Sequence, residues 1–455
     1  MLNRRIAASL AVFCFVASFS FAQQAAVVSE KQDVAVFALG YYGYDIPLET
    51  LATVDAEIQG VFVNLGRFNV FGATERFAAK DVQAFVDTLR TMKEKNTPLP
   101  DELKFGDVQM TESLYNKLFG AFVVVIPTIT SFDSQFNNSQ KQYETTIDTS
   151  VAFIDVANGT TFGFANISTS GSSKETQFKS IKSAIDGIAF QLTFEIRKIP
   201  VFTLNSRVLQ VQGGEVKMQL GQDMGIQVGD EFAVIVKSEV AGFADDREDG
   251  LILIKNVGSQ VSTGTVLYAG KGLGEGAQLR EIPRLGVDLM PYLSYIKYFG
   301  TVDGWELGTE DEANSDGTLA AGLRAVLSRG FYDLRPLAGI QVNFDPNLWL
   351  PVIAYFGGEY NIYLRRLAFT ASASFAVASN VIVKIIESQA EDSDDEWFTH
   401  LGVMADAGLS FLVTRNMRIY ANVGAEYLFG IASALEGPFQ SYGGYGLTVG
   451  AILKQ

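Results

Sequence analysis

The last third of the chain, residues 285–455, alternates apolar and polar side chains with a period of two in eight successive runs. In Leu401–Val413, one face holds leucine, valine, alanine and phenylalanine, whereas most residues of the other are small or polar. Because successive side chains of a β-strand point to opposite faces, each run separates an apolar from a polar environment. The eight runs are Val287–Tyr295, Leu319–Leu327, Ala338–Phe344, Val352–Leu364, Leu367–Val377, Leu401–Val413, Ile419–Phe429 and Tyr445–Leu453.

The connections between these runs indicate which kind of β-structure they form. Long connections, two of them strongly acidic, alternate with short ones that contain arginines: the long ones are 300–317, 345–350, 379–399 and 430–443, and the short ones 328–336, 365–366 and 414–417. Outer-membrane barrels combine short periplasmic turns with longer external loops, and their strands need roughly 9–11 residues to cross hydrocarbon. We therefore predict an eight-stranded antiparallel transmembrane β-barrel at 284–455, in preference to a soluble β-sandwich with one polar face.

With these runs and turns, residues 285–455 resemble the OmpA-like eight-stranded outer-membrane barrels. The resemblance implies a bacterial outer-membrane location, with lipid around the strands and the short turns in the periplasm. The chain departs from that family at Ile452–Gln455, where an aromatic residue usually stands. This departure concerns recognition by the insertion machinery.

The first 22 residues have the pattern of a secretory signal peptide. Arg4 and Arg5 precede the apolar run Ile6–Phe21, and the small residue Ala22 fits the cleavage site. Cys14 could mark a lipoprotein signal, but the bulky Phe13 before it does not fit. Without Cys14, the only cysteine, the processed chain has no thiol for a disulfide or a catalytic thiolate.

Residues 23–200 are predicted to form an α+β periplasmic domain. The periodicity predicts the order strand, helix, strand, helix, strand, strand, strand, helix, with a further short helix around Thr111–Leu118. We place the start of the last helix near Lys174, with Ser172 and Glu175 as a capping box. The element order, with Arg67–Val70 after the first helix, resembles the periplasmic domain shared by the curli-secretion lipoprotein, the penicillin-binding-protein activators and the flagellar assembly protein T.

Residues 201–283 read as a small all-β domain, because short strands are separated by glycine turns. Their sequence, from Val208–Val211 to Thr263–Val266, resembles the SH3-like barrel that ends the same flagellar assembly protein. Glu281–Arg284 is predicted to be a short linker that holds the soluble part close to the membrane.

Few residues have the pattern of catalytic or metal-binding chemistry. His400 is the only histidine, which argues against a histidine-based triad or a multi-histidine metal site. Gly270–Gly276 opens no predicted helix, so we interpret it as a turn and not as a phosphate loop. Asp245–Gly250 and Asp392–Glu396 could bind calcium but lack full EF-hand spacing, and we interpret both as solvated loops. No cofactor is predicted, and a formal net charge of −16 argues against nucleic acid as a partner.

Six charged residues fall on the inward face of the predicted barrel. They can form an ion path or an internal salt-bridge network, and the second hypothesis is favoured because eight strands enclose only enough space for their own side chains. These residues are Asp288, Arg324, Glu359, Asp406, Arg418 and Glu426.

The combined prediction is a non-enzymatic outer-membrane protein whose barrel anchors a periplasmic assembly or envelope-binding module. Its partner would be a periplasmic protein or the cell wall, and its oligomeric state is left open. Two alternatives belong to other classes. One is a surface adhesin or ligand-binding protein that uses the acidic external loops, and the other is a narrow transport or gating barrel.

Overall fold

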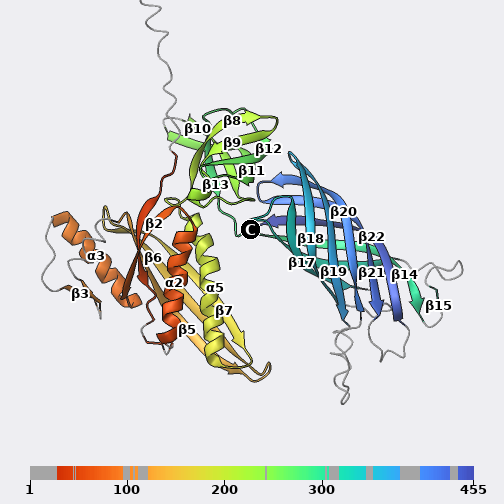
Figure 1. Ribbon diagram of the computed structural model, residues 1–455, viewed down its shortest axis with the longest axis horizontal. Helices are drawn as coiled ribbons and strands as arrows, with labels where there is room; N and C mark the ends of the chain where they lie inside the picture. Colours follow the sequence, from red (N-terminus) through yellow and green to blue (C-terminus); the bar gives the residue numbers. More distant parts are fainter. Residues whose placement is uncertain are drawn as a thin grey trace, which may run out of the picture.

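The computed structural model describes residues 28–41, 43–44, 46, 48–95, 103–105, 108–110, 121–240, 243–302, 305–306, 317–344, 352–379, 400–430 and 439–455. The predicted signal peptide, the helix expected around Thr111–Leu118 and most of the acidic external loops lie outside these residues. Figure 1 shows three β-structures: an N-terminal mixed sheet with helices, a small barrel coloured green, and a larger C-terminal barrel.

The N-terminal domain is a five-stranded sheet covered on both faces by helices. Strand β1, parallel to β2 and β5, alternates its side chains between two cores. Val34 and Val36 pack with α2 and α5, whereas Phe37 packs on the other face with Phe85 of α3. The sheet order is β2-β1-β5-β6-β7. The elements are β1 (Gln32–Ala38), α2 (Leu48–Asn64), β2 (Phe68–Arg76), α3 (Ala79–Lys95), β3 (Leu103–Phe105), β4 (Val108–Met110), β5 (Val123–Asn137), β6 (Gln142–Asp155), β7 (Thr160–Ser173) and α5 (Gln177–Lys198).

The predicted element order is found in this domain, with the β3–β4 hairpin as an unpredicted addition. The predicted start of the last helix was wrong. Strand β7 stays paired with β6 as far as Ser173, so Ser172 cannot cap a helix. Helix α5 begins at Gln177, and the hydroxyl of Thr176 caps it by accepting from the backbone N–H of Lys179.

The middle domain is a closed barrel of six strands in the order β10-β11-β12-β9-β8-β13. Two expectations fail here. Asp245–Gly250 lies within β11 and pairs with β10, so it is strand and not a solvated loop. Glu281 and Ile282 end β13 and are buried, so they are not linker residues. The strands are β8 (Asn205–Gln212), β9 (Glu215–Gln219), β10 (Glu231–Val240), β11 (Phe243–Val257), β12 (Val261–Ala269) and β13 (Gln278–Ile282).

The C-terminal domain is an eight-stranded antiparallel barrel, closed by pairing of its first strand, β14, with its last, β22. All eight predicted strands are present, and the two-residue β15 extends the first hairpin. The strands are β14 (Val287–Val302), β15 (Trp305–Glu306), β16 (Thr318–Leu327), β17 (Leu334–Asn343), β18 (Val352–Leu364), β19 (Leu367–Ser379), β20 (His400–Thr414), β21 (Met417–Gly430) and β22 (Phe439–Lys454). In the described part of the chain, no helix is both long and apolar enough to cross a membrane.

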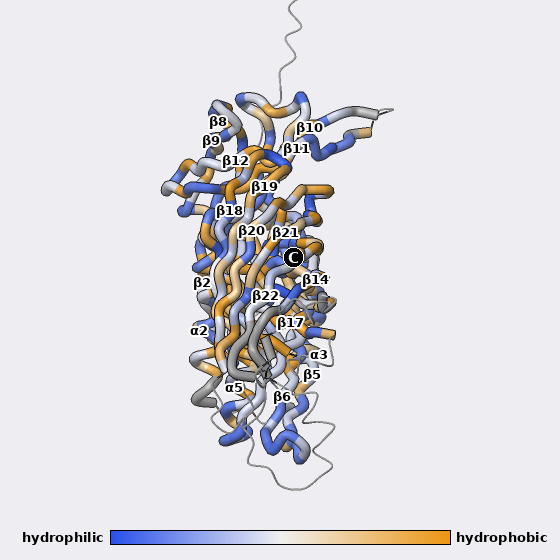
Figure 2. The backbone as a smooth tube through the Cα atoms, turned by 90° about the vertical axis from the view of Figure 1, so that its right-hand side faces the viewer, coloured by the Kyte–Doolittle hydropathy of each residue, from blue (hydrophilic) through white to orange (hydrophobic). Residues whose placement is uncertain are grey.

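The two faces of the barrel wall differ as the alternation predicts. The outward side chains of Val423 and Phe375 are 65% and 63% exposed, whereas the inward Asn422, next to Val423, is only 2% exposed. Figure 2 shows hydrophobic residues recurring along the neighbouring strands β18–β21. The outside of the barrel is therefore apolar, whereas its polar and most of its charged side chains lie inside, together with a cluster of buried apolar residues.

Candidate functional site: the barrel interior and the three-domain junction

The middle of the barrel interior contains one ion pair and a cluster of tyrosines. Arg324 on β16 pairs with Asp406 on β20 at 2.7 Å, and Asp406 also accepts from Ser372 and Asn422. Tyr292 and Tyr355 share a hydrogen bond of 2.9 Å between their hydroxyls. The Tyr292 ring lies over Gly322 and the Tyr355 ring over Gly339, where any larger residue would clash with the ring, so glycine makes room for the tyrosines that fill the lumen.

Glu426 lies towards the end of the barrel that carries the long loops, and hydrogen bonds through Gln341 and Asn343 connect it to the tyrosine cluster. Its carboxylate accepts from the hydroxyl of Tyr298, which itself accepts from the side-chain amide of Asn343 at 2.9 Å. The ion pairs found among the described residues include none for Glu426. This acid is therefore held by neutral donors.

The end of the interior that faces the small barrel, called the inner end below, holds Asp288, Glu359 and Arg418. Asp288 and Glu359 both pair with Arg335, the first at 3.2 Å. The sequence predicts Arg335 in the short turn 328–336, but β17 begins at Leu334 and directs this arginine inward. Its odd-numbered parity with the inward Gln341 and Asn343 was the signal that could have identified it. The six predicted residues thus lie inside the barrel. A chain of hydrogen bonds through tyrosines, Gln341 and Asn343 links Arg324 and Asp406 to Glu426. Asp288 and Glu359 share Arg335 at the inner end, apart from this chain.

A second set of buried charges, which the sequence analysis missed, joins the three domains. At its centre is Glu281 of the small barrel, which is 3% exposed. Its carboxylate accepts two hydrogen bonds from Arg67, at 2.8 and 3.1 Å, and one from Nε of Arg197 at 2.8 Å. Both arginines belong to the N-terminal domain. Burial alone would raise the pKa of the Glu281 carboxyl, but the two arginines outweigh it and hold the pKa well below its usual range.

Asp230, at the start of β10, binds arginines from both other domains. Its Oδ1 accepts from Nη2 of Arg197 in α5 at 2.9 Å and from Nε of Arg329 at 3.0 Å. Arg329 lies in the turn between β16 and β17 of the C-terminal barrel. The backbone N–H of Gln227 donates to the other oxygen at 2.8 Å. A single buried carboxylate therefore connects helix α5 to the C-terminal barrel.

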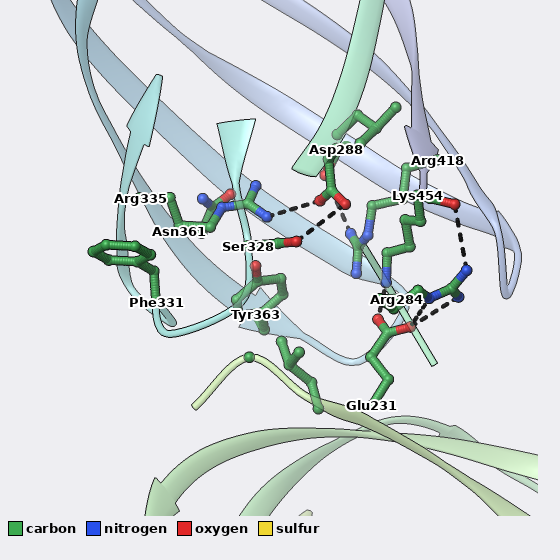
Figure 3. Close-up of a pocket in the computed structure, with 14 residues that line it drawn as sticks. Glu231, Arg284, Asp288, Ser328, Phe331, Arg335, Asn361, Tyr363, Arg418 and Lys454 are labelled. Atoms are coloured by element: carbon green, nitrogen blue, oxygen red, sulfur yellow. Dashed lines mark hydrogen bonds and ion pairs between the residues drawn. The ribbon is translucent and has the colours of Figure 1, made fainter. Parts of the chain in front are cut away.

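Glu231, the next residue, points into the inner end of the C-terminal barrel. It pairs with Lys454 at the end of β22 and with Arg284 at 2.9 Å (Figure 3). Burial would raise the pKa of the Glu231 carboxyl, but Lys454 and Arg284 outweigh this effect and lower it. Nη2 of Arg284 also donates to the backbone carbonyl of Arg415 at 2.7 Å, which ties the turn between β20 and β21 to the same cluster.

Apolar and close backbone contacts complete this junction. Leu251, Leu253 and Leu267 of the small barrel form a buried cluster with Leu412 of β20. The guanidinium of Arg366 stacks 4.2 Å from the ring centre of Tyr268.

Two glycines allow the backbones of neighbouring domains to meet. Gly229 has a φ of +84°, and a Cβ there would overlap the carbonyl oxygen of Ser328 in the C-terminal barrel. At Gly225, with a φ of +73°, a Cβ would overlap the carbonyl of Leu65 in the N-terminal domain. The small barrel thus fits closely between the other two domains and covers the inner end of the C-terminal barrel (Figure 1).

Comparison with known proteins gives only distant likenesses. No family model and no curated protein matches the chain. The C-terminal barrel is similar to Neisserial surface protein A, with 14% identity over 37% of this chain and 97% of that one, and a TM-score of 0.26. It is also similar to the N-terminal barrel of Pseudomonas aeruginosa OprF, with 12% identity over 36% and 96% and a TM-score of 0.20. The chain further matches the lipoprotein GNA1162 of Neisseria meningitidis, with 15% identity over 35% and 98% and a TM-score of 0.21.

Proposed function

We propose that this protein is a non-enzymatic outer-membrane anchor that holds a periplasmic α/β module in one orientation beneath the membrane. The observation that carries the proposal is the buried bridge from Arg197 through Asp230 to Arg329, which joins all three domains. A flexible tether needs no such bridge, because a few solvated residues would keep the module nearby equally well.

The membrane assignment rests on the surface of the barrel wall. An exterior of exposed leucine, valine and phenylalanine around a closed set of strands suits lipid, in which every backbone polar group must be paired within the protein.

The resemblance of the middle domain to an SH3-like barrel, and of the first domain to the flagellar assembly protein T, supports a role in docking a periplasmic protein or the cell wall.

The buried charges favour orientation as the purpose of the junction. Buried ion pairs contribute little net stability compared with apolar packing, since desolvation offsets their attraction, but a mispaired arrangement leaves an unpaired charge and is strongly disfavoured. Arg67, Arg197 and Glu281 therefore penalise any other docking geometry of the two soluble domains.

Spin labels on the full chain test the orientation. With Lys182→Cys on α5 and Asp333→Cys in the turn before β17, we expect a narrow distance distribution by pulsed electron paramagnetic resonance. Glu281→Ala should broaden it. The matched control is the pair Asp333→Cys and Thr414→Cys, because both residues lie at this end of the C-terminal barrel. Its distance distribution should stay narrow with and without Glu281→Ala. A broad first distribution in the otherwise unchanged chain would contradict the proposal.

Protease protection tests the location independently. A tag inserted in 300–317 or 379–399 should be cleaved on intact cells, whereas a tag at Arg365–Arg366 should be protected, because the short turns face the periplasm. Cleavage only at the short turn would invert the membrane topology.

A further inference from the structure

A small cavity lies at the inner end of the C-terminal barrel, directly above the small barrel. Its volume is about 30 Å³, and Glu231 and Leu253 approach it from the small barrel, whereas the strands of the C-terminal barrel provide most of its lining. Four cationic side chains line it: Arg284, Arg335, Arg418 and Lys454 (Figure 3).

Arg418 is the cation whose charge is least balanced in this cavity. Its side chain is buried, with 3% exposed, and donates from Nη1 to the hydroxyl of Ser410 at 3.2 Å and to the carbonyl of Arg366 at 3.4 Å. Its Nη2 is buried without an acceptor among the residues that the structure describes. Nε of Arg335, on the other side of the cavity, is likewise without an acceptor there. Each of these two guanidinium groups, which line one cavity, therefore has one nitrogen without an acceptor among the described residues.

The local charges do not balance either. Glu231 forms ion pairs with Lys454 and Arg284. Asp288 and Glu359 both form ion pairs with Arg335. No ion pair with a described carboxylate remains for Arg418. An arginine cannot lose its proton, and the cation–π contact of Arg418 with Tyr363, 5.5 Å from the ring centre, does not neutralise its charge. A buried charge without an opposite charge beside it costs several kcal/mol. The arrangement calls for a negative charge inside the cavity.

The size of the cavity limits what can supply that charge. One water needs roughly 10–15 Å³ of such volume, so about 30 Å³ accommodates one or two water-sized species. A phosphate or carboxylate group is too large. We propose that the cavity is a binding site for a monatomic anion, with chloride as the ligand, held by Nη2 of Arg418 and Nε of Arg335. Water alone would accept the hydrogen bonds but would leave the charge of Arg418 unbalanced.

Such an anion would also belong to the joint between the two barrels. It would neutralise the charge of Arg418 at the start of β21, near Lys454, whose partner Glu231 is a residue of the small barrel. Chloride binding would therefore favour the docked position of the small barrel. This inference does not depend on what the periplasmic module binds.

Crystals of the full chain grown in bromide provide the direct test, because bromide replaces chloride and is located by its anomalous scattering. We expect a peak within hydrogen-bond distance of Arg418 Nη2. Difference density typical of water, without an anomalous peak, would overturn the proposal, as would bromide bound only at the protein surface.

Thermal unfolding of the full chain in detergent provides a second test. At constant ionic strength, replacing gluconate with chloride should raise the Tm by about 2 °C or more, since a ligand of the folded state stabilises it by mass action. Arg418→Gln should abolish this dependence, and Arg207→Gln, which removes an exposed arginine far from the cavity, should preserve it. If Arg418→Gln does not fold, the bromide experiment still decides. Equal chloride dependence in both variants would contradict the site.

Discussion

The wall of the C-terminal barrel and the junction beneath it use charge in opposite ways. On the wall, outward residues such as Val423 and Phe375 are apolar and exposed, and most of the charged residues are inside. At the junction, the charged residues Glu281, Asp230 and Arg197 are themselves the buried contact between domains. Any sufficiently apolar wall is stable in lipid, so the wall determines only the kind of environment that surrounds it. Buried charges are stable only when their partners are in place, so the junction determines which domain surface packs there.

The largest effect is expected from breaking the junction at its centre. Glu281→Ala leaves Arg67 and Arg197 buried without their shared carboxylate, which should destabilise the contact between the N-terminal and middle domains by about 3–5 kcal/mol. Urea titration of the full chain, with protease cleavage of the soluble domains as the readout, measures this. Glu275→Ala, at an exposed acid nearby, should be neutral. A loss below about 1 kcal/mol for Glu281→Ala would mean that the contact is not charge-dependent.

The wall should respond to a charge nearly as strongly. Val423→Arg puts a cation on the lipid side of β21, at an expected cost of about 2–4 kcal/mol near the bilayer midplane. Asn422→Ser is the control at the adjacent inward position. It removes a hydrogen bond to Asp406 and should cost only about 1 kcal/mol. The fraction of folded barrel, seen as altered mobility of unheated samples on gels, compares them. Equal tolerance at both positions would refute the assigned faces.

A double-mutant cycle sharpens the comparison by measuring one contact across the junction. Asp230→Asn and Arg329→Gln, alone and together, should give a coupling energy of about 0.5–3 kcal/mol, because the two side chains share a hydrogen bond of 3.0 Å. The same titration supplies the four free energies. Additive effects would show that the turn at Arg329 does not help to hold the small barrel.

The smallest effect is expected from mild acid. The folded-state pKa values of Glu281 and Glu231 are lowered, so their contribution is fully present above the unfolded value of about 4.3 and is lost as pH falls through the folded values. The stability difference between the unchanged chain and Glu281→Ala should therefore be constant from pH 7 to about 5 and shrink below about 4. An increase of that difference on acidification would contradict the assigned pairing.

The features that depended on a local pattern were predictable from the sequence. The eight barrel strands and their inward residues followed from a period of two, because the direction of a strand side chain depends on its own backbone. Errors arose at the ends of elements. Arg335 was assigned to a turn, and Ser172 to a helix cap, because neither β17 nor β7 shows in its own residues how far its partner strand continues to pair.

The junction was decided by the tertiary structure. Arg67 and Glu281 are 214 residues apart in the sequence. Considered alone, each is an ordinary charged residue next to or within a predicted strand. Only the packing of the N-terminal domain against the small barrel removes both from water and makes them partners, since the energy of a buried charge depends on what surrounds it and not on its neighbours in sequence. By contrast, an apolar residue on alternate strand positions favours lipid or a core wherever the chain places it. The sequence by itself therefore determined that there would be a barrel with an apolar exterior. Only the folded molecule decided that a small barrel closes its inner end through Asp230 and Glu231 and holds the N-terminal domain through Glu281.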